Sequence, residues 1–109
     1  MICTSIQNKT YEQILELLAN PQIEMAEIRL DRCDLTKEQI EDLFSNSDTP
    51  LVATCRISEV GESIAEKRLK TAIEAGARFA DLEIEAPSSM SKEFQKSCLR
   101  HGTEIIRSY

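Results

Sequence analysis

Three charged residues of this sequence are well suited to binding a polar ligand: Glu27, Arg29 and Arg56. Each guanidinium group can present a fork of donors to a carboxylate or to hydroxyls, and a glutamate can accept a hydrogen bond from a hydroxyl. Glu27 and Arg29 are two residues apart, so both face the same side if the segment is a strand. The set favours a ligand that carries a carboxylate and hydroxyls. A structural alternative remains open, in which the arginines form interior salt bridges such as Arg29 with Glu83 or Arg56 with Glu27.

A catalytic nucleophile or base is harder to find. His101 precedes Gly102, which is expected to end a helix, so the histidine is predicted to be a helix C-terminal residue. Gly61 and Gly76 do not form a phosphate-binding loop. The lysines are expected on the solvent-exposed side of helices or just before them: Lys9, Lys37, Lys67, Lys70, Lys92 and Lys96.

The four cysteines, Cys3, Cys33, Cys55 and Cys98, form no CxxC pair and no metal-ligand spacing with His101. We therefore expect no metal site and no disulfide framework. Cys3 and Cys55 fall in expected strands, which favours buried free thiols in a reducing compartment.

Composition sets further limits on function. The chain has 109 residues, the size of one domain, and 41% of them are hydrophobic, which is enough for a core. Its net charge of −6 gives no bulk attraction for nucleic acid or an anionic membrane. The first residues enter a strand without a basic region or a long apolar run. We expect a soluble, cytoplasmic protein.

Strand and helix signals alternate along the chain. Strands are expected at 2–6, 25–31, 51–56, 79–85 and 104–109, with a helix in each interval. Capping boxes predict three helix starts, namely Thr10 with Gln13, Thr36 with Gln39, and Ser63 with Glu66. A loop is expected at 57–62, and Gly76 is placed to end the third helix. The order βαβαβαβαβ fits either a doubly wound sheet or part of a (β/α)8 barrel.

The strand faces distinguish these two folds. Glu27, Arg29 and Asp31 share one face, and Ile28 and Leu30 the other. In a doubly wound sheet such charges would lie beneath helices, whereas in a barrel they face the interior near its mouth. The expected inward set is Cys3, Ser5, Met25, Glu27, Arg29, Asp31, Val52, Thr54, Arg56, Phe79, Asp81, Glu83 and Glu85. It becomes more polar toward the strand ends, so we predict an α/β fold that is a partial (β/α)8 TIM barrel. A full barrel takes roughly 250 residues, so this chain supplies about half.

Five segments resemble type I 3-dehydroquinate dehydratase. They are Glu27-Ile28-Arg29-Leu30-Asp31, Ala53-Thr54-Cys55-Arg56, Ala72-Ile73-Glu74-Ala75-Gly76-Ala77, Asp81-Leu82-Glu83-Ile84-Glu85 and Ile105-Ile106-Arg107-Ser108-Tyr109. The resemblance implies that residues 1–109 are the N-terminal half of one barrel domain, and that the enzyme is usually a homodimer. Its substrate would be the small molecule 3-dehydroquinate, which is dehydrated to 3-dehydroshikimate in the shikimate pathway without metal or cofactor. In that family a lysine forms an imine with the substrate ketone and a histidine moves the proton.

The resemblance also implies roles for individual residues. Ser5, Glu27, Arg29 and Arg56 match substrate-binding positions of the family. A glutamate that often orients the catalytic histidine is replaced by Val60, which Glu59 and Glu62 flank, so the resemblance leaves open whether Glu59, Glu62 or neither takes that role. The family's histidine and lysine match positions after Tyr109, so the 109-residue chain alone is expected to be inactive.

Two other functions are compatible with the same residues. One is a non-catalytic half-barrel that self-associates and at most binds a cyclic polyhydroxy acid. The other is a different imine-forming barrel enzyme of the aldolase type, which shares the charges at the mouth.

Overall fold

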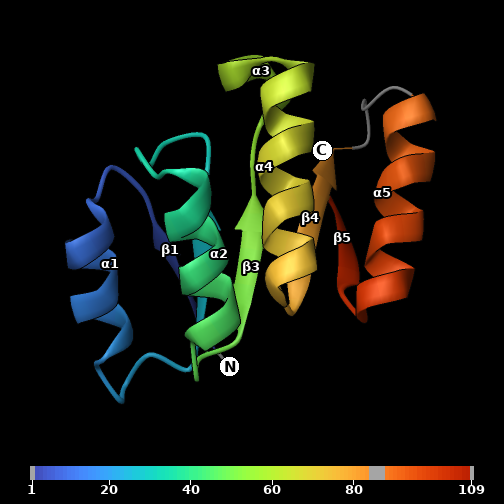
Figure 1. Ribbon diagram of the computed structural model, residues 1–109. Helices are drawn as coiled ribbons and strands as arrows, with labels where there is room; N and C mark the ends of the chain where they lie inside the picture. Colours follow the sequence, from blue (N-terminus) through green and yellow to red (C-terminus); the bar gives the residue numbers. More distant parts are fainter. Residues whose placement is uncertain (1, 84–87, 109) are drawn as a thin grey trace.

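The computed structural model describes residues 2–83 and 88–108 of the chain, and in them strands and helices alternate (Figure 1). The elements are β1 (Cys3–Ile6), α1 (Tyr11–Leu18), β2 (Met25–Arg29), α2 (Lys37–Asn46), β3 (Leu51–Thr54), α3 (Ile57–Val60), α4 (Glu62–Ala75), β4 (Phe79–Glu83), α5 (Ser88–His101) and β5 (Glu104–Ser108). Each expected strand is present, although β1, β2 and β3 are shorter than predicted. Ile84, Glu85 and Tyr109, which we expected at strand ends, lie outside the described residues.

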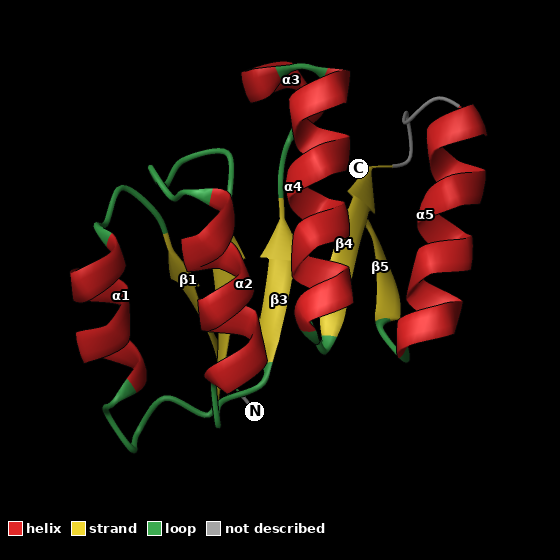
Figure 2. Cartoon of the chain, in the orientation of Figure 1, coloured by secondary structure: helices red, strands yellow, loops and turns green. Residues whose placement is uncertain are grey.

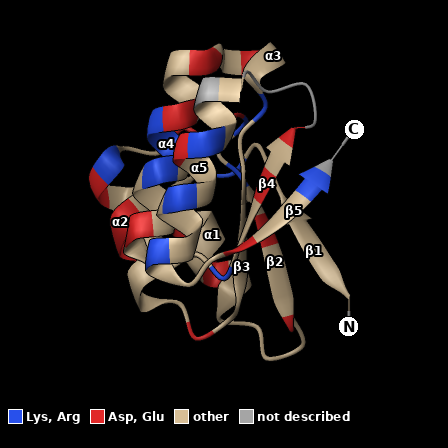
Figure 3. Cartoon of the chain, turned by 90° about the vertical axis from the view of Figure 1, so that its right-hand side faces the viewer, with Lys and Arg blue, Asp and Glu red and all other residues tan. Residues whose placement is uncertain are grey.

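The strands form one parallel sheet in the order β1-β2-β3-β4-β5, so each strand pairs with its neighbours in sequence (Figure 2). The register places Glu27 beside Ser5 on one side and beside Val52 on the other. Viewed from the side, the helices lie against one face of the sheet and leave the other face uncovered (Figure 3). Sequential strand order with helices on one face is the arrangement of a (β/α)8 barrel, and it excludes the doubly wound sheet.

Burial follows the predicted division of the strand faces. Ala26, Ile28 and Ala53 have no exposed surface, because they point toward the helices and join the hydrophobic core. Glu27 and Arg29 alternate with them on the uncovered face and are half-buried. Leu69, Ile73, Met90, Phe94 and Cys98 supply the helical side of the core.

Local signals explain where most helices begin and end. The side-chain oxygens of Thr10 and Thr36 each accept a hydrogen bond from the backbone N–H three residues on. The side chains of Gln13 and Gln39 in turn accept from the backbone N–H of Thr10 and Thr36, so both capping boxes are confirmed. Gly76 ends α4 with φ +117°, a conformation that favours glycine.

The third predicted capping box, Ser63 with Glu66, is wrong. α4 begins at Glu62, its N-cap is Gly61, and no side chain caps it. The short helix α3 precedes it within the segment that we expected to be a loop. Gly61 is both the C-cap of α3 and the N-cap of α4, so α4 starts two residues earlier than the Ser63 signal suggested.

The buried cysteines are Cys33, Cys55 and Cys98, whereas Cys3 is exposed. The expectation for Cys3 is thus corrected, because β1 is an edge strand of this sheet and Cys3 lies on its uncovered face. All four thiols are free. Within residues 2–83 and 88–108, no helix combines the length and the apolar character needed to cross a membrane.

Candidate ligand-binding site

The carboxylate of Glu27 is held in place by hydroxyls from the two neighbouring strands. Ser5 Oγ donates a hydrogen bond to Glu27 Oε1 at 2.8 Å, and Thr54 Oγ1 donates to Oε2 at 2.8 Å. Both oxygens therefore have a partner before any ligand arrives, and the side chain is fixed across β1, β2 and β3. A carboxylate oxygen can accept more than one hydrogen bond, so Glu27 keeps the capacity to accept from a ligand hydroxyl.

Arg29, at the end of β2, forms a two-point contact with Asp31. Its Nε donates to Asp31 Oδ1 at 3.1 Å and its Nη2 donates to Oδ2 at 2.7 Å. The Asp31 side chain has 0% exposed surface and that of Arg29 only 17%. The hydrogen bonds that Arg29 donates to Asp31 raise the pKa of Arg29, so the guanidinium is fully charged.

Arg56 follows the end of β3, and acidic residues of β4 contact both its side chain and its neighbour in the chain. Its Nη2 lies 3.9 Å from Asp81 Oδ2. Glu83 Oε1 accepts a hydrogen bond of 2.6 Å from the backbone N–H of Ile57, the first residue of α3. The predicted salt bridges had the wrong partners: Arg29 pairs with Asp31 rather than Glu83, and Arg56 with Asp81 rather than Glu27.

Arg32 connects three strand ends at the rim of this region, and it was missed by sequence reasoning. Its Nη2 donates to Glu59 Oε1 on α3 at 2.8 Å, and its Nη1 donates to Gln7 Oε1 after β1 at 3.2 Å. Its Nε lies 4.0 Å from Asp31 Oδ2. The inward residues of this segment are two apart, and Arg32 directly follows one of them. The alternation that predicted Arg29 therefore did not predict Arg32.

The four predicted site residues thus share the uncovered face. Ser5 and Glu27 contact each other, and Arg29 and Arg56 lie closer to the carboxyl ends of their strands. Cys55, between Thr54 and Arg56, points to the helical side, and burial raises the pKa of its thiol to about 12. It is therefore a neutral core residue rather than a nucleophile.

His101 was predicted at the end of a helix and the lysines on the solvent-exposed side of helices or just before them, and both predictions are confirmed. His101 is the exposed last residue of α5, and the six lysines are exposed on helices or just before them. In residues 2–83 and 88–108, no three metal-binding side chains are grouped so that they could hold an ion. The chemistry available here is the binding of anionic and hydroxylated groups.

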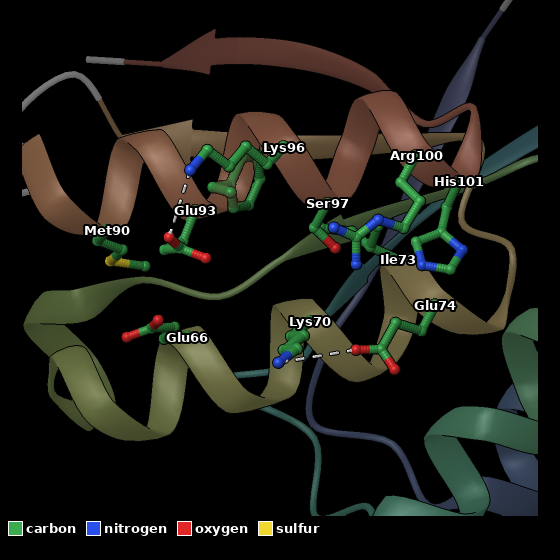
Figure 4. A pocket seen from close by; sticks show the side chains of 11 residues that line it. Glu66, Lys70, Ile73, Glu74, Met90, Glu93, Lys96, Ser97, Arg100 and His101 are labelled. Atoms are coloured by element: carbon green, nitrogen blue, oxygen red, sulfur yellow. Dashed lines mark ion pairs between the residues drawn. The ribbon is translucent and has the colours of Figure 1, made fainter.

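A hollow of about 350 Å³ lies on the helical side, between α4 and α5 (Figure 4). Its charges alternate in sign and pair locally, with Lys70 Nζ 4.0 Å from Glu74 Oε1 and Lys96 Nζ 4.0 Å from Glu93 Oε1. These pairs are exposed and leave no excess of one charge to select a ligand. The strand ends, where charges are partly buried and held in fixed positions, are the better candidate site.

Comparison with known families agrees with this fold. The family model described as type I 3-dehydroquinase matches residues 2–109. The chain belongs to the type I 3-dehydroquinase family. A 3-dehydroquinate dehydratase from Desulfotalea psychrophila is 32% identical over 117 residues, which cover 99% of this chain and 50% of that protein. The chain spans about half the length of the curated relative it matches.

A solved structure of the same family has the same fold over this half. It is a type I 3-dehydroquinate dehydratase from Clostridium difficile with covalently modified comenic acid. The match has a TM-score of 0.78 at 20% identity and covers 98% of this chain and 49% of that one. The five-stranded sheet of this type I 3-dehydroquinase chain is therefore half of a TIM barrel.

Proposed function

We propose that residues 1–109 form the N-terminal half of a type I 3-dehydroquinate dehydratase, the part of the barrel that binds 3-dehydroquinate. The supporting observation is that Glu27, Arg29 and Arg56 gather on the uncovered face of a type I 3-dehydroquinase chain, at the strand ends where barrel enzymes bind their substrates. The product would be 3-dehydroshikimate, in the shikimate pathway.

Each residue of the set has a role that its contacts support. Glu27, fixed by Ser5 and Thr54, accepts a hydrogen bond from a ring hydroxyl of the substrate, and Ser5 lies beside that contact. Arg29 uses Nε and Nη2 for Asp31, which leaves its Nη1 donors without a partner among the described residues. These donors and the guanidinium of Arg56 bind the substrate carboxylate.

The bond-breaking groups come from the remainder of the barrel in this proposal. A lysine there forms an imine with the substrate ketone, which stabilises negative charge on the neighbouring carbon while a histidine removes its proton and assists the loss of water. No metal or cofactor is needed for this chemistry. The residues described above hold the substrate ring in place while these steps occur.

Borohydride reduction in the presence of 3-dehydroquinate tests this function. The full-length protein should convert the substrate and give a stable covalent adduct of the expected mass, whereas the 109-residue chain should give none. The reason is that every lysine of residues 2–83 and 88–108 is exposed on a helix or just before one, and none lies within a strand. A full-length protein without turnover, or an adduct on the 109-residue chain, would overturn the proposal.

Location and assembly follow as part of the same proposal. Three buried thiols that form no disulfide are suited to a reducing compartment such as the cytoplasm. The uncovered face and the two edge strands of the sheet support assembly into a homo-oligomer or with the other half of the barrel. Family membership argues against the aldolase alternative, and the trapping experiment separates an enzyme from a non-catalytic binding protein.

A further inference from the structure

We propose that Glu83 is a positioning residue that fixes the place of Arg56 through the backbone of α3. The inference rests on the proposed function, because it assigns Arg56 to the substrate carboxylate. Glu83 would act without touching the substrate. Its own contact is with a peptide N–H of the protein.

The peptide unit between Arg56 and Ile57 is tied to α3 on one side and to β4 on the other. The Arg56 carbonyl oxygen accepts hydrogen bonds from the N–H groups of Glu59 at 3.1 Å and Val60 at 3.4 Å. The next N–H along the chain, that of Ile57, donates to Glu83 Oε1 at 2.6 Å. A shift of α3 would therefore move the Cα of Arg56, and with it the guanidinium at the end of a long side chain.

Glu83 provides a contact that the local sequence does not supply. Arg56 is the N-cap of α3, and it makes no side-chain hydrogen bond to the helix. The first N–H groups of a helix need partners, and a carboxylate also interacts favourably with the helix dipole at that end. Glu83 reaches from β4, the strand next to β3, so the contact sets the position of α3 relative to the sheet. α3 lies at the carboxyl end of β3 (Figure 1).

The two acidic residues of β4, Asp81 and Glu83, contact different parts of the segment around Arg56. Asp81 lies 3.9 Å from the Arg56 guanidinium and is nearly buried, so it contacts that side chain directly. Glu83, two residues further along the same face, holds the main chain that follows Arg56. Loss of Glu83 should thus loosen Arg56 while leaving its charge and its contact with Asp81 unchanged.

Kinetics of the full-length enzyme test this role through a double-mutant cycle with Arg56→Lys. Glu83→Ala removes the acceptor and should raise KM about tenfold with a smaller change in kcat, and Glu83→Gln, which keeps an oxygen at that place, should raise it less. In the Arg56→Lys background, Glu83→Ala should raise KM little further, since the guanidinium fork that Glu83 positions is already absent. The control is Glu66→Gln, an exposed acid on α4, which should leave KM within about twofold.

A second measurement does not depend on activity. In Glu83→Ala, the amide of Ile57 should exchange with solvent faster, and the NMR signal of Arg56 Nε–H should shift or broaden, while both are unchanged in Glu66→Gln. If these signals stay the same, or if the KM effects of Glu83→Ala and Arg56→Lys multiply, the positioning role is overturned. Absence of turnover by the wild-type protein would instead overturn the proposed function, and the NMR comparison would still decide the role of Glu83.

Discussion

Asp31 accepts two hydrogen bonds from Arg29, and the shorter one joins Arg29 Nη2 to Asp31 Oδ2 at 2.7 Å. The Asp31 side chain is completely covered although it follows the last residue of β2. One edge of the Arg29 guanidinium is thus bound to Asp31, and this contact orients its remaining donors. The pair makes Asp31 part of the candidate site, even though no ligand contact is assigned to it.

Asp31→Asn is expected to lower the free energy of unfolding of the full-length protein by about 1 to 3 kcal/mol. The amide keeps one acceptor, but its NH2 group faces the donors of Arg29, and the buried guanidinium loses its charge partner. Urea unfolding measures the difference. The control is Glu41→Gln, which breaks the exposed contact of 3.9 Å with Lys37 and should cost less than about 0.5 kcal/mol. Equal losses in the two variants would contradict this account of Asp31.

Arg56→Lys is expected to raise KM for 3-dehydroquinate about tenfold in the full-length protein, because a lysine keeps the charge but cannot donate from a planar fork. Steady-state kinetics give the value. Arg78→Lys is the matched control, since Arg78 precedes β4 at the opposite end of the strand and stacks near Phe79. An unchanged KM in Arg56→Lys would show that Arg56 has a structural role, such as its contact with Asp81, and does not bind the substrate.

The strand faces were predictable from sequence because burial on one side of a sheet imposes a two-residue period. The alternation of apolar Ile28 and Leu30 with charged Glu27 and Arg29 correctly predicted which face of the sheet is covered by helices. The same alternation favoured the barrel over the doubly wound sheet. The site residues followed from the same period, since the polar residues occur where the strands end.

The ion-pair partners could not be predicted in this way. Which acid meets Arg56 depends on the register between β3 and β4, in which Val52 pairs with Phe79, and on the side-chain conformation. α3 was missed for a related reason: four residues are too few to show a helical period, and its first N–H is satisfied by Glu83, 26 residues away in the chain. The sequence predicted the correct face for Cys3 but not its exposure, because burial on that face depends on what packs against it.

Alkaline pH is expected to destabilise the protein through its buried thiols. Burial raises the pKa of Cys98 to about 11 and of Cys55 to about 12, from 9.0 for an unburied thiol. The folded state therefore keeps these protons between pH 9 and 11, where the unfolded state releases them, and stability falls as the pH rises through that interval. Unfolding midpoints at pH 8, 9, 10 and 11 should decline more steeply in the wild type than in Cys98→Ala. Parallel curves would contradict the assignment.

The 109-residue chain by itself is expected to self-associate. Its sheet has two edge strands, β1 and β5, and a face without helices, on which Ile106 of β5 lies beside Asp81 with 38% of its surface exposed. Unpaired edges next to exposed apolar side chains favour pairing with another chain. Sedimentation at micromolar concentration should show dimers or larger species.

Two substitutions locate the surface responsible. Ile106→Lys places a charge on the uncovered face and should shift the chain toward monomer, because burying an unpaired ammonium group is costly. Leu99→Lys is the control, since Leu99 is 87% exposed but lies on α5, on the helical side of the sheet. If Leu99→Lys dissociates the chain and Ile106→Lys does not, association occurs through the helices. A wild-type chain that stays monomeric and unfolds cooperatively would show that five strands of this barrel are stable with their inner face in water.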